Sequence, residues 1–337
     1  MPSCGDAVRA VLACYPAAHP AGRVEPLGNA GGFSGARFWR VESAGGTLCL
    51  RGWPPEHPTP QGLCQIHAVL LHVARAGLRI VPAPLPTGSG SSYVEWGGRL
   101  WELAPWMPGE ANYRRAPTPA KLRSAMRSLA VFHTLAAEFP DADREPAPAS
   151  GILERRELLA RWTRGGVEQL RRAVRAAAGG PLDERAQRLL LLFPRLAAQV
   201  ADQLERASQH AVAQQPCIRD IWHNHVLFTG EEVSGLVDFG ALRRDHVAAD
   251  IARLLGSLVG DDERQRQIGL QAYEEVRTLD MAERQLIDAY DASSVLLSGM
   301  NWLRWVYLEK RHFESPAAVL ARVDENLARV ERAVQRR

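Results

Sequence analysis

Short alternating runs of hydrophobic and polar residues dominate the first hundred positions, a pattern typical of strands. The runs lie at 23–27, 36–41, 47–51, 93–96 and 99–103. The second and third are joined by Ser-Ala-Gly-Gly, and the last two flank Gly97 and Gly98, which can take the positive φ angles of a tight hairpin. The pattern therefore predicts five strands in one antiparallel sheet.

Helical spacing appears between the third and fourth of these runs. Apolar residues recur at intervals of three and four from Leu63 to Val73. Thr59 is a predicted N-cap with Pro60 at the first helical position, and Gly77 ends the segment. We expect this helix to pack on the sheet through its apolar face.

Two prolines and a glycine at 105–110 predict a stiff connector after the last strand. We place a domain boundary there, with an N-terminal nucleotide-binding lobe at 1–104, a hinge at 105–110 and a mainly helical lobe at 111–337. The pattern beyond the hinge predicts helices at 119–139, 152–177 and 181–209, and three more after Val247. A short β hairpin, with strands at 225–228 and 233–239, interrupts them. The expected fold class is α+β.

Composition narrows the class of protein. A chain of 337 residues with 46% hydrophobic content is long enough for two cores. Its 41 basic and 38 acidic residues are interleaved and give a net charge of +3, which argues against a nucleic-acid partner. The longest apolar run, 189–193, is too short to cross a membrane, and no signal peptide is apparent at the N-terminus. The five cysteines form no CxxC pair, so we expect a reducing, cytoplasmic location.

Two aspartates on either side of the predicted hairpin are the strongest chemical signal. Asp220 lies in Ile-Arg-Asp-Ile-Trp-His-Asn-His-Val-Leu-Phe at 218–228, and Asp238 begins Asp-Phe-Gly. Taken alone, Asp220 fits a helix or turn cap as well as a catalytic role, and Asp238 fits an ordinary strand end. Together, and separated by one hairpin, they resemble the catalytic loop and metal-binding turn of the aminoglycoside phosphotransferase, choline kinase and homoserine kinase-like superfamily. That resemblance implies a two-lobed, protein-kinase-like fold.

The resemblance assigns different roles to the two carboxylates. Asp220 would accept or orient the proton of a substrate hydroxyl, and Asp238 would hold the magnesium ions that bridge the nucleotide phosphates. Asp250, in Ala-Ala-Asp-Ile-Ala, resembles the family's aspartate that braces the catalytic loop, a role compatible with helix capping.

One position departs from the family pattern. The residue five after Asp220, an asparagine in the family, is His225, and Asn224 stands one place too early. Imidazole is a poorer ligand than an amide oxygen for magnesium, so His225 as a metal ligand would shift preference toward manganese or leave one ion weakly held. A core or hydrogen-bonding histidine is the alternative, and the sequence leaves both open.

The N-terminal lobe supplies the expected nucleotide contacts. The glycine-rich segment at 28–35 would approach phosphates through its backbone, and Gly32 and Ser34 are our candidates within it. The resemblance places a basic residue on the third strand against the α and β phosphates, which here is Arg51 because the lobe has no lysine. The C=O of Glu102 and the N–H of Ala104 are our candidates for adenine contacts.

One element of the resemblance is absent. The following helix lacks the carboxylate that would pair with the basic residue, since Gln65 to Ala68 occupy that region. Another group must therefore orient Arg51.

These features predict an ATP-dependent transferase, with Mg²⁺ or Mn²⁺, that moves a γ-phosphate to a hydroxyl of an aminoglycoside, choline, homoserine or sugar-like acceptor. We expect a small-molecule alcohol as substrate, without a nucleic-acid or membrane partner. A nucleotide-binding pseudokinase is the alternative. A protein kinase is disfavoured because the Ala-Pro-Glu element and the histidine before Arg219-Asp220 are missing. The acceptor, the nucleotide preference and the oligomeric state stay open.

Overall fold

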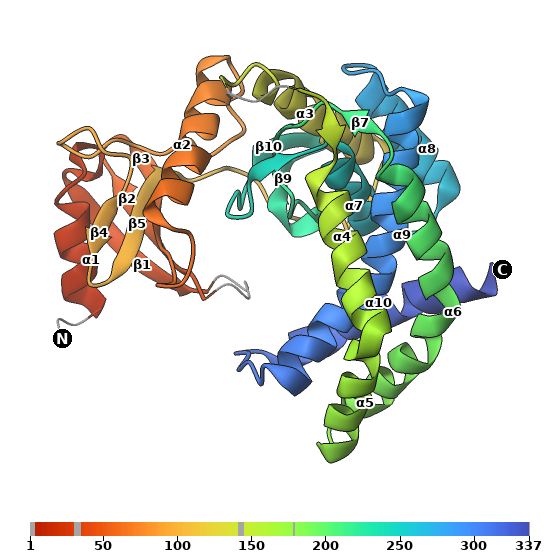
Figure 1. The fold of residues 1–337 in the computed structure, drawn as a ribbon. Coiled ribbons are helices and arrows are strands. Elements are labelled where there is room, and N and C mark those ends of the chain that lie inside the picture. The colour runs from red at the N-terminus through yellow and green to blue at the C-terminus, as the bar shows by residue number, and fades with distance from the viewer. Residues whose placement is uncertain (1–3, 30–34, 141–144, 178, 337) are drawn as a thin grey trace. The chain divides into compact units, whose positions relative to one another are not determined.

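The computed structural model describes residues 4–29, 35–140, 145–177 and 179–336 (Figure 1). The chain forms two compact units. Unit 1 comprises 1–140, 220–243 and 275–277, and unit 2 comprises 141–219, 244–274 and 278–337. The predicted lobe boundary at 105–110 stays a prediction.

Unit 1 holds the sheet and its helices. Its strands are β1 (Ala21–Gly28), β2 (Arg37–Ser43), β3 (Gly46–Gly52), β4 (Val94–Trp96), β5 (Arg99–Pro105), β9 (Val226–Thr229) and β10 (Glu232–Leu236). Its α-helices are α1 (Cys4–Leu12), α2 (Pro60–Arg75) and α3 (Pro119–Ala136). Strands β1 to β5 form one sheet in the order β1-β2-β3-β5-β4, with antiparallel pairing throughout. The predicted five-stranded antiparallel sheet is confirmed.

Helices α1 and α2 lie on opposite sides of this sheet (Figure 1), and each contributes to a separate cluster of buried residues. On one face, Val11 of α1 packs in a cluster with Leu50 and Leu103. On the other face, Leu63 of α2 packs with Trp53 and Leu100. The sequence pattern predicted only α2, so α1 is an addition that the structure makes to the lobe.

Helix α2 begins as its sequence predicts. The side chain of Thr59 accepts a hydrogen bond from the Gly62 N–H at 3.1 Å, and Pro60 occupies the first turn, where its missing N–H costs nothing. The apolar face that follows is buried from Leu63 to Val73.

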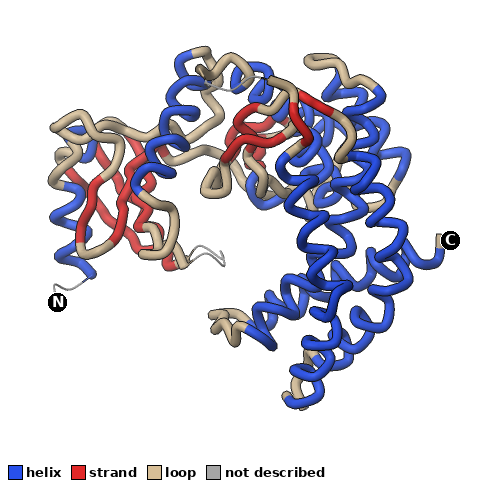
Figure 2. The backbone as a smooth tube through the Cα atoms, viewed as in Figure 1, coloured by secondary structure: helices blue, strands red, loops and turns tan. Residues whose placement is uncertain are grey.

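Unit 2 is mainly helical (Figure 2). It contains α4 (Ser150–Arg161), α5 (Val167–Ala176), α6 (Asp183–Ala207), α7 (Ala248–Leu258), α8 (Glu263–Glu274), α9 (Met281–Leu303) and α10 (Pro316–Gln335). Its short strands are β6 (Ala147–Pro148), β7 (Ala211–Val212), β8 (Gln215–Cys217) and β11 (Arg243–Asp245), the last of which begins at the unit boundary.

Helix counts and boundaries in unit 2 differ from the sequence expectation. The predicted helix at 152–177 is broken by a π-helical turn at Trp162–Gly166, in which Gly165 has φ of 137°. Among the described residues, four α-helices rather than three follow Val247. Two of these four helices begin at caps: Asp280 and Glu283 form a capping box at α9, and Ser315 caps α10. None of the described helices has the length and apolar content that a membrane span needs.

The predicted connector is tied to strand β9 within unit 1. Glu110 and Phe228 exchange two backbone hydrogen bonds, of 3.0 and 2.9 Å. Gly109, with φ of 93°, lies so close that a Cβ there would stand 2.6 Å from the Phe228 carbonyl oxygen. Glycine is required at this position both by the φ angle and by the approach of β9.

We expect Gly109→Ala to lower the free energy of unfolding by roughly 2 to 4 kcal/mol, because it adds backbone strain to a steric overlap. Chemical denaturation measures the change. Gly88→Ala is the matched control, since its Cβ would meet no atom closer than 3.9 Å. Equal unfolding midpoints for the two variants would contradict the expectation.

Candidate active site

The loop that carries Asp220 is closed by hydrogen bonds to the ring of His225. His225 Nδ1 lies 2.9 Å from the backbone oxygen of Asp220 and donates to it, since a carbonyl can only accept. The indole N–H of Trp222 donates to His225 Nε2 at 2.7 Å. This pair of bonds defines a neutral imidazole with its proton on Nδ1. The arrangement fits the hydrogen-bonding interpretation of His225.

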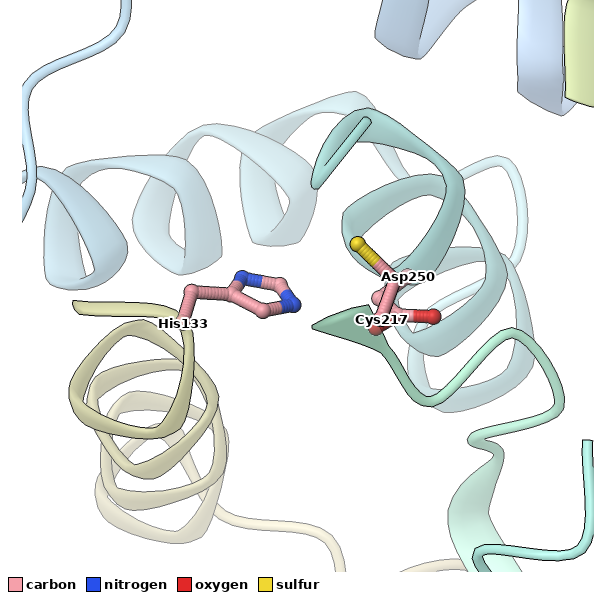
Figure 3. A group of neighbouring side chains, drawn as sticks. All are labelled: His133, Cys217 and Asp250. Atoms are coloured by element: carbon pink, nitrogen blue, oxygen red, sulfur yellow. The ribbon is translucent and has the colours of Figure 1, made fainter. Parts of the chain in front are cut away.

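The residues just before Asp220 are held within unit 2 by Asp250. One carboxylate oxygen accepts from the Ile218 N–H at 2.7 Å, and the other accepts from the Arg219 N–H at 2.6 Å. Arg219 has φ of 65°, an uncommon conformation that these bonds help to stabilise. Asp250 is fully buried, and the predicted brace is confirmed. Figure 3 shows Asp250 on α7 beside Cys217 of β8; the third labelled side chain, His133, belongs to unit 1.

Asp238 lies next to the same histidine. The Val237 N–H donates to the His225 carbonyl oxygen at 2.9 Å, and Asp238 Oδ2 is 3.5 Å from His225 Nε2. Asp238 has φ of 62°, another left-handed residue in the candidate site. The structure thus places the loop of Asp220 and the turn of Asp238 side by side through His225.

Arg51 reaches Asp238 from strand β3. Its Nη2 donates to Asp238 Oδ1 at 3.1 Å, while the Nε of Arg51 is buried without a hydrogen-bond partner. Burial raises the pKa of Asp238, but the charge of Arg51 and the hydrogen bond from its guanidinium lower it by more, so the net pKa lies below the usual value. Asp238 is therefore a carboxylate at neutral pH, as a ligand for a hard cation must be.

The hydrogen bonds of strand β5 determine whether the backbone groups of Glu102 and Ala104 are available for adenine contacts. Toward β3, the Leu100 carbonyl accepts from Trp53 N–H at 2.8 Å, and Trp106 N–H donates to the Thr47 carbonyl at 3.0 Å. Away from β3, the Leu103 carbonyl accepts from Leu85 N–H at 2.8 Å.

Backbone groups of alternate residues in a strand point to the same side. Even-numbered positions of β5 therefore face β3, and Glu102 and Ala104 are paired there with Arg51 and Cys49. Adenine contacts from Glu102 and Ala104 stay a prediction, and the register disfavours them because the ladder already uses those groups. The outward-facing groups belong to Leu103 and Pro105.

The side chain of Glu102 has a different partner. Its carboxylate lies 2.6 Å from Nε2 of His67, a buried residue of α2 whose Nδ1 is 2.8 Å from Ser92 Oγ. Gly32 and Ser34, the candidate phosphate contacts, lie outside the described residues, and their role stays a prediction.

Sequence reasoning missed two aromatic residues of this site, Trp53 and Trp222. Trp53 stands two positions after Arg51, so the period of a strand already placed both side chains on one face. Trp222 carried no comparable signal, because its bond to His225 depends on a tight turn at 223–225.

The fold is similar to solved structures of small-molecule phosphotransferases. An aminoglycoside phosphotransferase from Alicyclobacillus acidocaldarius matches with a TM-score of 0.63 and 16% identity, over 98% of this chain and 96% of that one. A spectinomycin phosphotransferase in complex with ADP and spectinomycin matches with a TM-score of 0.65 and 11% identity, over 94% of each chain. At such identities the likeness shows the fold, and the predicted α+β, protein-kinase-like class is confirmed.

Residues 26–287 match the model of the phosphotransferase enzyme family. The chain belongs to this family, which confirms the superfamily that the two aspartate motifs indicated. A homoserine kinase of Gluconobacter oxydans is 32% identical over 202 residues. That match spans 53% of this chain and 64% of the kinase, slightly less than two thirds of its length.

Proposed function

We propose that the protein is an ATP-dependent phosphotransferase that moves the γ-phosphate to a hydroxyl of a small molecule. The observation that carries the proposal is the linked set in unit 1: the Asp220 loop bonded to His225, His225 beside Asp238, and Asp238 bonded to Arg51. Family membership supplies the reaction class.

In the proposed reaction, Asp220 accepts the proton of the acceptor hydroxyl as its oxygen attacks the γ-phosphorus. The new P–O bond forms while the bond to the β–γ bridging oxygen breaks, and ADP leaves with those electrons. The His225 ring donates a hydrogen bond to the Asp220 carbonyl oxygen, which holds the backbone of the loop in place. The two residues before Asp220 donate their N–H groups to the Asp250 carboxylate. The loop is thereby ordered before substrate arrives, which reduces the entropy cost of reaching the reactive geometry.

The residues present fit a divalent cation with a nucleotide. Asp238 supplies a deprotonated hard oxygen, and the unpartnered Nε of Arg51 is a buried donor of the kind a phosphate oxygen would satisfy. A bound Mg²⁺ or Mn²⁺ would neutralise charge on the phosphates. We propose Asp238 as its principal ligand and His225 as a second one, for which Nε2 has to exchange its hydrogen bond from Trp222 for the metal.

The proposed acceptor is a small alcohol, with homoserine the first to test because of the Gluconobacter relative. The experiment is a panel of homoserine, choline, ethanolamine, an aminoglycoside and simple sugars, assayed for ATP consumption with Mg²⁺ and Mn²⁺ in parallel. We expect acceptor-dependent turnover with at least one compound. Nucleotide binding without transfer to any alcohol would instead support the pseudokinase alternative, which the His225 substitution motivates.

The variant His225→Asn tests the metal role of this residue. We expect the ratio of Mg²⁺-supported to Mn²⁺-supported turnover to rise several-fold, because an amide oxygen suits magnesium better than an imidazole nitrogen. Steady-state rates with each ion measure the ratio. The matched control is His72→Asn on α2, whose Nε2 lies 3.2 Å from the Leu135 carbonyl oxygen and whose ring packs edge-on to Phe139. An unchanged ratio together with a lower unfolding midpoint would show that His225 acts only through its hydrogen bonds and is not a metal ligand.

A further inference from the structure

Nothing on helix α2 tethers Arg51. The helix, Pro60–Arg75, contains no aspartate or glutamate, and its buried His67 is bonded to Glu102 and Ser92 instead. A buried guanidinium has long, flexible χ angles and needs contacts that fix its plane if it is to meet a ligand in one geometry.

Those contacts come from two aromatic rings on the same face of the sheet. Trp53 follows Arg51 by two residues, and Phe38 on β2 is the cross-strand partner of Arg51. The guanidinium carbon of Arg51 lies 3.4 Å from the Trp53 ring centroid and 5.1 Å from that of Phe38. Arg51 is only 7% exposed and Trp53 only 2%, so the stacking occurs away from water, where cation–π attraction is strongest.

Trp53 also touches the turn that carries Asp238. A Cβ added to Gly240 would stand 3.0 Å from Cη2 of Trp53, so the indole packs closely against the glycine of Asp-Phe-Gly. His57 packs edge-on to Trp53, and its Nε2 lies 3.1 Å from the Gly240 carbonyl oxygen. One indole ring therefore contacts both Arg51 and the turn of the candidate metal ligand.

Stacking on an aromatic ring leaves more guanidinium N–H groups available for a ligand than a bond to a carboxylate does. A bidentate helical glutamate would occupy two of the five guanidinium N–H groups. A ring against the guanidinium plane occupies none of them. In this structure Arg51 uses Nη2 for Asp238 and keeps Nε without a partner.

We propose that Trp53 is the positioning residue for Arg51, in place of the carboxylate that α2 lacks, and that it fixes the guanidinium plane for a nucleotide phosphate. The proposal rests on the proposed function, because it takes the phosphates as the ligand of Arg51. Trp53 acts through Arg51 and contributes to nucleotide affinity more than to the transfer step.

The test is a double-mutant cycle with Trp53→Leu and Arg51→Gln, read by ATP binding in calorimetry and by steady-state kinetics. We expect Trp53→Leu to weaken ATP binding and raise its KM about 5- to 30-fold, with a much smaller change in kcat. The conservative Trp53→Phe should recover most of the affinity. In the Arg51→Gln background, Trp53→Leu should cause little further loss.

The control is Trp96→Leu on β4, a tryptophan that is 42% exposed; its ATP affinity should match wild type. Equal effects of Trp53→Leu with and without Arg51, or no rescue by phenylalanine in a folded variant, would overturn the proposal. If the wild type binds ATP, the cycle shows coupling and no alcohol is phosphorylated, then the phosphotransferase proposal alone fails. If transfer occurs but the cycle shows no coupling, the positioning role alone fails. A wild type that binds no ATP overturns both.

Discussion

Asp220→Asn is expected to lower acceptor-dependent phosphoryl transfer by roughly 10² to 10⁴-fold, the usual contribution of a positioned general base. The amide keeps the size of the side chain but cannot take up the hydroxyl proton. Because the backbone of Asp220, rather than its side chain, accepts the bond from His225, we expect the loop and the ATP affinity to survive. Single-turnover assays with the acceptor identified by the panel, beside calorimetric titration with ATP, measure the two effects separately.

Asp202→Ala is the matched control, an exposed aspartate on α6. It should turn over at the wild-type rate. Unchanged turnover in Asp220→Asn, with an unchanged unfolding midpoint, would refute the role assigned to Asp220.

Asp238→Ala is expected to abolish metal-dependent nucleotide binding. The change removes the proposed principal ligand of the cation, and it also removes the partner of Arg51, whose side chain is 8% exposed. Leaving a buried guanidinium without its carboxylate is costly. We expect ATP affinity in the presence of Mg²⁺ to fall by roughly 10²-fold or more, and turnover to fall at least as far.

Titration with ATP in the presence and absence of Mg²⁺ checks this expectation, because only the metal-dependent part of the affinity should disappear. Glu231→Ala, an exposed acid in the β9–β10 turn, controls for a change of charge in the same hairpin. Affinity for ATP that still rises with Mg²⁺ in Asp238→Ala would show that another group holds the ion.

The two variants separate the proposed functions. A phosphotransferase requires both Asp220 and Asp238, whereas a nucleotide-binding module requires only Asp238. Loss of binding in Asp238→Ala without any transfer activity in the wild type would therefore favour the binding module. Loss of transfer in Asp220→Asn with ATP binding intact would exclude it.

The sequence by itself determined the strands of the sheet, the start of α2 and the two aspartate motifs. These features are local: a strand shows in alternation with period two, a cap such as Thr59 shows in the residues beside it, and Asp220 and Asp238 are separated by a single hairpin. The family match over 26–287 agrees with that local evidence. Helix α1 was missed because its packing partners, such as Leu50 and Leu103, are distant in the sequence. The fourth helix after Val247 was missed although its capping residues are local signals.

The tertiary structure alone decided which partners the site residues have. Alternation told us that Arg51 and Trp53 share a face, but not that the ring would take the place of a helical carboxylate. The edge of β5 to which the Glu102 and Ala104 backbone groups point depends on which strand lies beside it, and that is a matter of sheet order. The hydrogen bonds of His225 likewise depend on a turn that brings Trp222 back onto the ring. The period and the spacing of residues are properties of one segment of the chain. A contact between side chains involves two segments, and only folding brings the two together.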